Sequence, residues 1–292
     1  MEPAITVGLD GSPESLAAAH WAAEEAQRRQ LTLRLLHAWP LLVPGPARLP
    51  AEVDQNYWAK RIVDNALSEL QARFPGLSVV GELVADDAQQ ALLKAAGESD
   101  MIVLGSRGLG SVESYFLGDI SMPVVARAEH AVVLVRANTR EAGPLPAPPR
   151  TAEPVVAAVQ LHGPCEDVLS FAFVTAAAWS APLRVVHGRS LPLHAHAPWG
   201  TDHGVAEEIA HEAREQLNQV LRAWREKFPG VEVTDVVRLE SPAKAVLREA
   251  EGAGLLTVGR RRHHPHLTAR LGPVAQAAVH HAGCAVAVVP HD

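Results

Sequence analysis

The chain of 292 residues has few cysteines, few aromatic residues and no excess of positive charge, and each shortage excludes a class of protein. Two cysteines, Cys165 and Cys284, cannot form a disulfide framework, so a reducing cytoplasm is the expected location. Aromatic residues make up 4% of the chain, which leaves little surface for stacking bases. A formal net charge of −7 also argues against a nucleic-acid partner.

Long apolar runs are missing too. No run approaches the roughly 18 residues that a membrane-spanning helix needs. The first residues, Met-Glu-Pro-Ala-Ile-Thr-Val-Gly, lack the basic region and the apolar core of a signal peptide. We therefore expect no membrane partner.

Two common phosphate-binding motifs are absent as well. No Gly-x-Gly-x-x-Gly follows the first apolar run, Ala4–Leu9, where a dinucleotide-binding domain carries it. The stretch from Gly105 to Ser111 resembles a P-loop but lacks the lysine after its last glycine. The sequence therefore predicts neither of these two sites.

What the chain does contain is a glycine-rich cassette, present twice. In the first copy an apolar run ends in Gly105, and Gly108 and Gly118 follow. In the second copy the spacing of thirteen positions from Gly259 to the last glycine is kept, but Arg262 replaces the middle glycine. A strand, a loop and a helix start in this order can bind phosphate with backbone N–H groups. The two copies are therefore predicted to have diverged in what they bind.

The repeat extends through both halves of the chain. His37 corresponds to His187, 150 positions later, and other pairs follow at 154. A period this long indicates two similar domains, since solenoid repeats have periods of roughly 20 to 50 residues. We place the domains at 1–140 and 154–292, joined by the proline-rich linker 141–153.

Each half predicts five short apolar strands separated by helical patterns. Most of these strands are continuously apolar at their centres, as in a parallel sheet covered on both faces. The expected strands are Ala4–Leu9, Thr32–Ala38, Ser78–Val84, Asp100–Gly105 and Ala131–Arg136 in the first half, and Val155–Val159, Leu183–His187, Glu232–Val237, Leu255–Gly259 and Ala285–Val289 in the second. The predicted fold class is α/β, with two tandem open doubly wound domains of Rossmann-like type, each with a five-stranded parallel sheet.

The helices carry capping signals and apolar stripes. The first is expected to begin at Ser12 as N-cap with Pro13 in its first turn, and to end with Arg28 and Arg29. Buried stripes are expected at Trp58, Ile62, Ala66 and Leu70 in the second helix, and at Ile209, Ala213, Leu217, Leu221, Trp224 and Phe228 in the long helix of the second half. Ligands of such sheets bind where the strand order reverses, so the loops after Asp10 and Gly105 should flank the site.

The opening Val7-Gly-Leu-Asp-Gly-Ser12, the terminal strand Ala131–Arg136 and the spacing Gly105-x2-Gly108-x9-Gly118 together resemble the universal stress protein family. The match covers nearly the whole chain outside the linker. In that family, glycines at this spacing followed by Ser or Thr mark the members that bind ATP. The family's fold is similar to that of adenine nucleotide alpha hydrolases. Its members pair through their last strands, which implies an internal pseudo-dimer of the two halves and a possible homodimer.

The resemblance also implies roles for individual residues. Leu9 and Asp10 would lie against the nucleotide, with Asp10 near the ribose, and the backbone of Ala38 would meet the adenine edge. The phosphates would be held by the loop and the following helix start, at Gly105, Arg107, Gly108, Gly118, Asp119, Ile120 and Ser121. ATP is the expected ligand.

Asp119 departs from the family pattern, because Ser or Thr is expected directly after the last glycine. An ionised carboxylate cannot donate a hydrogen bond to phosphate and repels it at short range. A bound Mg²⁺ between carboxylate and phosphate would reverse that repulsion. Either Mg²⁺ accompanies ATP here, or Asp119 abolishes binding.

The second half departs further. Gln160 replaces Asp10, and Pro273 stands where Ser or Thr would follow the last glycine, which removes an N–H group from the helix start. We therefore expect no ATP site of the family type in this half. The loop Arg260–His266 is strongly basic and could bind an anion or a partner carboxylate by charge.

Several residues that invite a catalytic or metal function have simpler explanations. The histidines His263, His264, His266, His280 and His281 match no zinc-binding spacing, so no metal site is expected. Cys284 precedes an apolar strand and is interpreted as a packing residue. His37 and His187 are expected to pack or hydrogen-bond at strand ends.

Three functions remain open at this point. The first is a regulatory stress protein that binds ATP in its first half, and the second is a scaffold of the same fold without a ligand. The third is a slow ATPase, although the motif supplies no clear general base or arginine finger. We expect no enzymatic activity beyond slow ATP hydrolysis.

Overall fold

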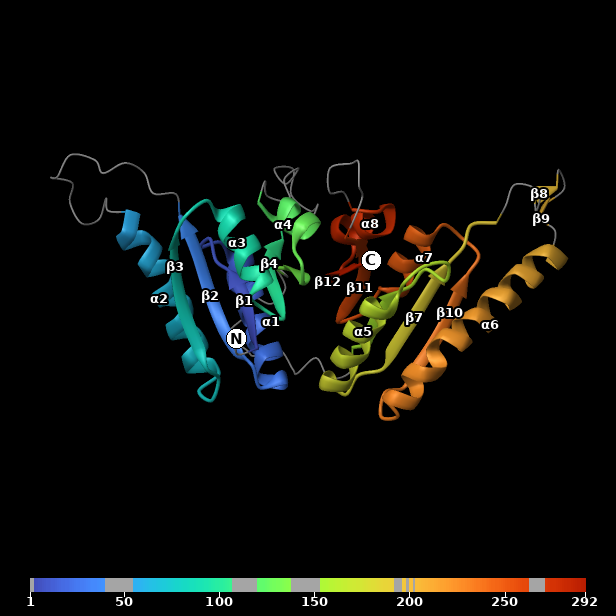
Figure 1. The fold of residues 1–292 in the computed structure, drawn as a ribbon, viewed down its shortest axis with the longest axis horizontal. Helices are drawn as coiled ribbons and strands as arrows, with labels where there is room; N and C mark the ends of the chain where they lie inside the picture. The colour runs from blue at the N-terminus through green and yellow to red at the C-terminus, as the bar shows by residue number, and fades with distance from the viewer. Residues whose placement is uncertain are drawn as a thin grey trace. The chain divides into compact units, whose positions relative to one another are not determined.

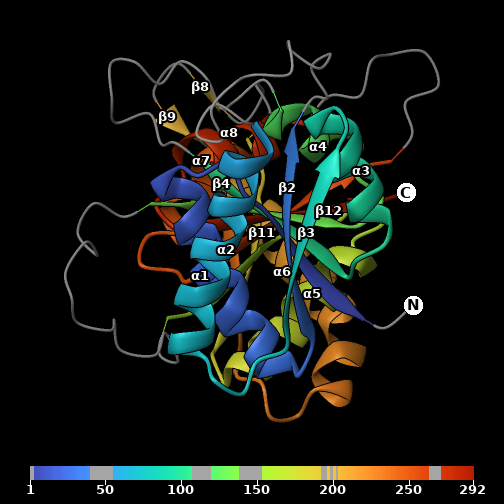
Figure 2. The same cartoon turned by 90° about the vertical axis from the view of Figure 1, so that its left-hand side faces the viewer.

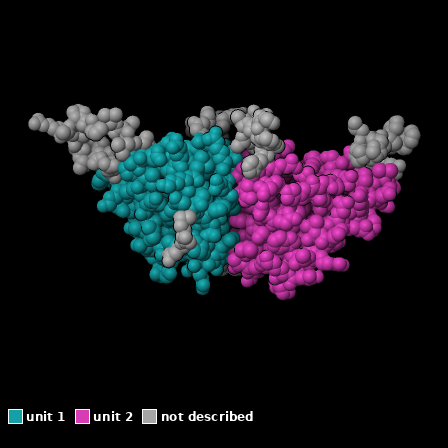
Figure 3. All heavy atoms as spheres, in the orientation of Figure 1, with its two compact units in different colours: residues 1–144 teal, residues 145–292 magenta. Residues whose placement is uncertain are grey.

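The computed structural model divides into two compact units, residues 1–144 and 145–292 (Figure 3). It describes residues 3–39, 55–106, 120–137, 153–191, 196–197, 200–201, 203–262 and 271–292. The predicted linker 141–153 lies outside this part of the chain except for Glu153. The expected docking of the two halves on each other stays a prediction.

The first unit alternates strands and helices from its beginning to its end (Figure 1). Its elements are β1 (Ala4–Gly8), α1 (Pro13–Arg29), β2 (Thr32–Trp39), α2 (Gln55–Arg73), β3 (Val79–Ala85), α3 (Ala88–Gly97), β4 (Met101–Ser106), α4 (Ser121–Arg127) and β5 (Ala131–Arg136). The five strands lie within one or two residues of the predicted ones.

The second unit repeats this order. Its elements are β6 (Val155–Ala158), α5 (Glu166–Trp179), β7 (Leu183–Gly188), β8 (His196–Ala197), β9 (Gly200–Thr201), α6 (His203–Lys227), β10 (Val233–Arg238), α7 (Pro242–Glu249), β11 (Leu255–Arg261), α8 (Pro273–His281) and β12 (Ala285–His291). The short antiparallel pair of β8 and β9 was not predicted. The pair lies within residues 191–204, where the second half is four residues longer than the first.

Both units contain the same five-stranded parallel sheet. The order in the first unit is β5-β4-β1-β2-β3, and in the second it is β12-β11-β6-β7-β10. In the first unit α1 and α2 cover one face, and α3 and α4 cover the other (Figure 2). The strand order reverses between β1 and β4, so the ends of these strands form the switch point where ligands bind. The predicted α/β doubly wound class is confirmed.

The alanine content of α1 explains how closely this helix packs on the sheet. Its N-cap is Ser12, whose Oγ accepts a hydrogen bond from the Ser15 amide at 3.1 Å, and Pro13 follows as predicted. The residues that face the sheet are almost all small, and they are completely buried: Ala18, Ala19, Ala22, Ala23 and Ala26. Small side chains let the helix backbone approach the strands, which brings its first turn to the ends of β1 and β4.

The apolar stripe of α2 differs from the prediction. Trp58 is 50% exposed, whereas Ala59 and Val63 are buried together with the predicted Ala66 and Leu70. Trp58 was predicted to be buried from its spacing and hydrophobicity. The buried face of the helix instead includes the neighbouring positions 59 and 63. A large aromatic ring at the start of the helix therefore lies outside the core.

The long helix α6 packs as predicted through Ala213, Leu217 and Leu221, all fully buried. Near its end, Trp224 and Phe228 stack on Phe173 of α5, with ring centroids 5.4 Å apart in both pairs. This aromatic cluster joins the two helices on one face of the second sheet. None of the helices in the described ranges is long and apolar enough to cross a membrane.

Candidate functional site

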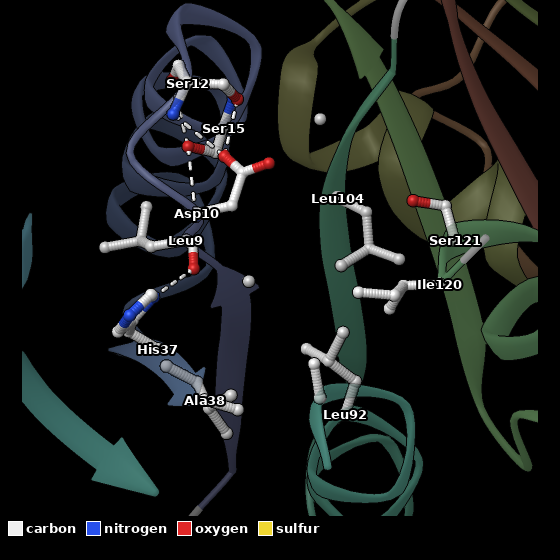
Figure 4. A pocket seen from close by; sticks show the side chains of 14 residues that line it. Leu9, Asp10, Ser12, Ser15, His37, Ala38, Leu92, Leu104, Ile120 and Ser121 are labelled. Carbon is white, nitrogen blue, oxygen red and sulfur yellow. Dashed lines mark hydrogen bonds between the residues drawn. The ribbon is translucent and has the colours of Figure 1, made fainter. Parts of the chain in front are cut away.

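A pocket of about 370 Å³ opens at the switch point of the first sheet. Figure 4 shows Leu9, Asp10, His37 and Ala38 on one wall, from the ends of β1 and β2. The opposite wall comes from β4, α3 and α4, and its labelled residues are Leu92, Leu104, Ile120 and Ser121. The volume falls in the usual range for small-molecule sites, and the walls combine a mostly apolar slot with polar groups at one side.

The turn between β1 and α1 supplies the polar groups. Asp10 Oδ1 accepts hydrogen bonds from the amide and the hydroxyl of Ser12, at 2.9 and 2.5 Å. The Asp10 amide donates to Ser15 Oγ at 3.4 Å, and Gly11 between them has a φ of +83°, which favours glycine. These bonds hold the carboxylate of Asp10 at the mouth of the pocket, next to the N-terminus of α1.

One ring nitrogen of His37 forms a hydrogen bond with the backbone. Its Nδ1 lies 2.7 Å from the carbonyl oxygen of Leu9, so Nδ1 carries the proton and donates it to that oxygen. The other ring nitrogen, Nε2, is then the acceptor of the neutral ring. The bond ties the end of β2 to the end of β1, as the hydrogen-bonding role predicted for His37 requires.

Gly105 has a packing role that does not depend on any ligand. A Cβ atom at this position would lie 2.5 Å from the backbone carbonyl carbon of Glu14 in α1. The glycine therefore permits α1 to pack against β4. The resemblance explained Gly105 by contact with phosphate alone, and the structure adds this second reason.

Six of the predicted site residues line the pocket together: Leu9, Asp10, Ala38, Gly105, Ile120 and Ser121. The other four, Arg107, Gly108, Gly118 and Asp119, lie outside the described residues. Helix α4 begins at Ser121 with Ile120 as its N-cap, and no side chain caps it.

Sequence reasoning missed part of the lining. Ser12 and Ser15 line the pocket through the α1 turn, and Ala88 and Leu92 do so through α3. In the sequence, Ser12 was interpreted only as a helix cap, and Ala88 and Leu92 belong to an ordinary apolar helix face. Only the packing of α1 and α3 around the strand ends brings these residues to the site.

The second unit has a pocket at the equivalent place, of about 470 Å³. Its lining includes Gln160 after β6, His187 in β7 and Gly259 in β11. These residues correspond to Asp10, His37 and Gly105 in the first unit. His187 repeats the bond of His37, with Nδ1 3.1 Å from the carbonyl oxygen of Val159. The loss of the glycine motif has therefore not closed the pocket.

These features define a class of protein in which a doubly wound α/β domain, present twice, carries a pocket where its strand order reverses. The family model described as "Universal stress protein family" matches residues 2–136 and 151–290. The chain belongs to the universal stress protein family and carries two of its domains in tandem.

Relatives of the same length and fold support this assignment. Universal stress protein Rv2005c of Mycobacterium tuberculosis is 30% identical, over 97% of this chain and 96% of its own length. The crystal structure of a universal stress protein from Archaeoglobus fulgidus superposes with a TM-score of 0.70 at 17% identity, covering 99% of this chain and 98% of that one.

Proposed function

We propose that this tandem universal stress protein is a regulatory protein of the stress response that binds ATP in its first unit. The observation that carries the proposal is the pocket at the switch point of β1 and β4. Its apolar walls suit a base and a sugar, and its polar side lies at the N-terminus of α1.

The proposed pose follows from the two walls. The adenine ring lies between Ala38 at the end of β2 and Leu92 of α3, and the ribose lies near Asp10. The phosphates extend toward Gly105 and Ser121. The other glycines of the motif, Gly108 and Gly118, lie between these two residues in the sequence. Mg²⁺ would bind between the phosphates and the carboxylate of Asp119, because carboxylate and phosphate oxygens are its preferred ligands.

The described pocket gives little support to rapid turnover of ATP. Asp10 is the one carboxylate among the described residues that line it, and its Oδ1 already accepts two hydrogen bonds from Ser12. A general base must reach the attacking water. We therefore propose that bound ATP biases the conformation or the partner choice of the protein rather than serving as its substrate.

Calorimetry of ATP binding to the full chain, in the presence of Mg²⁺, tests the proposal. We expect one site per chain, lost in Ala38→Trp, where the indole fills the adenine slot, and in Gly118→Val. Gln160→Ala changes the equivalent second pocket and should bind ATP like the wild type. Asp119→Ser should bind ATP without Mg²⁺ more tightly, by roughly fivefold, because the variant lacks one negative charge that would repel the phosphates.

Two outcomes would contradict the proposal. Absence of binding to the wild type, with or without Mg²⁺, would favour a scaffold that acts through protein contacts. Rapid release of inorganic phosphate from bound ATP would favour the ATPase alternative.

A further inference from the structure

Most residues that line the first pocket have an equivalent in the lining of the second, yet the charged side chains of the two pockets have opposite sign. The first pocket carries the carboxylate of Asp10, where the second carries the neutral Gln160. Ser12 is replaced by His162, and Arg189 and His291 line the second pocket with no basic counterpart among the residues that line the first. The described lining of the second pocket includes no acidic side chain.

The basic groups of the second pocket are gathered at the ends of β6 and β7. His162 and Arg189 lie close enough to His187 to affect its ionisation. Burial is the main cause that lowers the pKa of His187, the hydrogen bond to Val159 opposes it, and His162 and Arg189 lower it further. His187 uses Nδ1 for the carbonyl oxygen of Val159, which leaves Nε2 as its remaining polar atom. An anion beside these groups would be attracted by the positive charge of Arg189.

Two carboxylates in this region of the second unit, Glu212 and Glu166, already have partners. Glu212 of α6 has its Oε2 3.7 Å from the Arg189 guanidinium, but both side chains are substantially exposed, at 58% and 36%. Such a surface pair contributes little, so an anionic ligand can compete with Glu212 for Arg189. At the start of α5, the amide of Cys165 donates to Glu166 at 3.0 Å. The Glu166 carboxylate therefore already accepts a hydrogen bond from the backbone at the start of α5.

The end of the pocket that would receive phosphate in a family-type site is partly filled. A Cβ atom on Gly259 would lie 2.8 Å from the ring of His291, so this ring packs directly on the glycine. β11 and β12 pair through Arg261 and His291, and the Arg262 amide donates to the His291 carbonyl at 2.7 Å. The ligand's charge is therefore expected at the opposite end, beside Arg189.

Much of the remaining lining of the second pocket is apolar. It includes five valine side chains, here called the valine floor: Val159, Val168, Val186, Val246 and Val274. In the part of the chain that the structure describes, no group of three or more histidine, cysteine or acidic residues could hold a metal ion. The histidines around this pocket are therefore better matched to an anion than to a metal.

We propose that the pocket of the second unit binds an amphipathic organic anion, with its acidic group at Arg189 and His162 and its apolar body on the valine floor. The charged end of this ligand occupies the place that the nucleoside occupies in the proposed ATP site. The proposal is independent of ATP binding in the first unit, because the two pockets share no residue.

Fluorescence titration of the full chain with anilinonaphthalene sulfonate tests the proposal, since this dye combines an aromatic body with one anionic group. We expect saturable binding at one site. Arg189→Gln should weaken it about fivefold, as for one half-exposed charged contact. Gln160→Glu, a nearly isosteric change at an exposed position, should weaken it similarly by placing a negative charge at the mouth.

Three further arms make the result decisive. Glu212→Gln removes the competitor for Arg189 and should strengthen dye binding. Asp10→Asn changes the first pocket in the matched position and should leave dye binding unchanged. Inorganic phosphate, which lacks an apolar body, should displace the dye poorly.

The proposal is overturned if the wild type shows no saturable binding, or if Arg189→Gln and Gln160→Glu bind like the wild type. It is equally overturned if Asp10→Asn weakens dye binding as much as they do, because the dye would then occupy the first unit. Efficient displacement by phosphate would contradict the amphipathic nature of the ligand. Circular dichroism of each variant establishes that it is folded.

Discussion

At the residue scale, the two units share a strand framework, and most of the side chains that line each pocket differ between them. His37 and His187 make the same bond to the end of the neighbouring strand. Asp10 and Gln160 then give the two mouths different charge. We expect this difference in charge to give the two pockets different ligand preferences, because a charge at the mouth of a small pocket acts on any ligand that binds there.

His187 gives the chain a stability that depends on pH. Burial lowers the pKa of His187 below its ordinary value of 6.5. The unfolded chain therefore binds a proton more readily than the folded chain, and the free energy of unfolding falls as the pH drops below about 6.5. We expect the urea midpoint to fall over this range in the wild type, and to fall less steeply in His187→Asn, whose amide can still donate to Val159.

A non-titrating variant of the same pocket serves as the control. Val186 is fully buried, so Val186→Ala should lower the urea midpoint at every pH. The dependence of the midpoint on pH should stay the same as in the wild type. An unchanged slope in His187→Asn would show that other groups cause the acid sensitivity.

At the scale of single elements, capping and side-chain size position the first pocket. Ser12 ends the turn after β1 and caps α1, and the alanine face of α1 carries that turn to β4. The equivalent helix α5 has Cys165 as N-cap, with no side-chain hydrogen bond to the helix. The first unit therefore has the more firmly held pocket mouth.

Ser12→Ala tests this role. We expect a loss of about 1 kcal/mol in the free energy of unfolding, since the Ser15 amide loses its capping acceptor. Urea unfolding of the full chain measures the change. Ser68→Ala is the matched control: Ser68 is exposed within α2, where alanine is the better helix former, so stability should be kept or slightly raised. Equal losses in the two variants would mean that the cap contributes nothing.

At the scale of the whole molecule, the tandem arrangement places two different pockets in one chain. The expected cytoplasmic location and the pairing of the two halves stay predictions. Two binding sites of different chemistry would let one protein respond to two signals, if each ligand changes only its own unit.

Hydrogen exchange of the full chain with and without ATP tests that separation. Amides of the turn from Asp10 to Ser15 should exchange more slowly with ATP, because a ligand that binds only the folded state stabilises it, by about 2.7 kcal/mol at a hundredfold excess over its dissociation constant. The equivalent turn from Gln160 to Cys165 serves as an internal control and should not change. Equal protection of both turns would show that ATP occupies both units or couples them.

Much of the fold was predictable because strands buried on both faces are continuously apolar. The runs at Ile5 and Val133 show this pattern, and the bounds of β1 and β5 agree with the prediction within a residue. The N-cap of α1 was also predictable, because Ser12-Pro13 is a local signal for a helix start and tertiary contacts do not override it here. The predicted stripe of α2 was right at Ala66 and Leu70 and wrong at Trp58, because spacing alone cannot tell which of two neighbouring residues faces the sheet.

The sequence by itself determined the two-domain repeat, the positions of the strands and the start of α1 at Ser12. These follow from hydrophobic periodicity and short-range capping, which act along the chain. Only the tertiary structure decided that a pocket persists in the second unit with a basic lining, and that Gly105 is needed for packing against Glu14. Both depend on side chains that are far apart in sequence and meet only when the helices pack on the sheet.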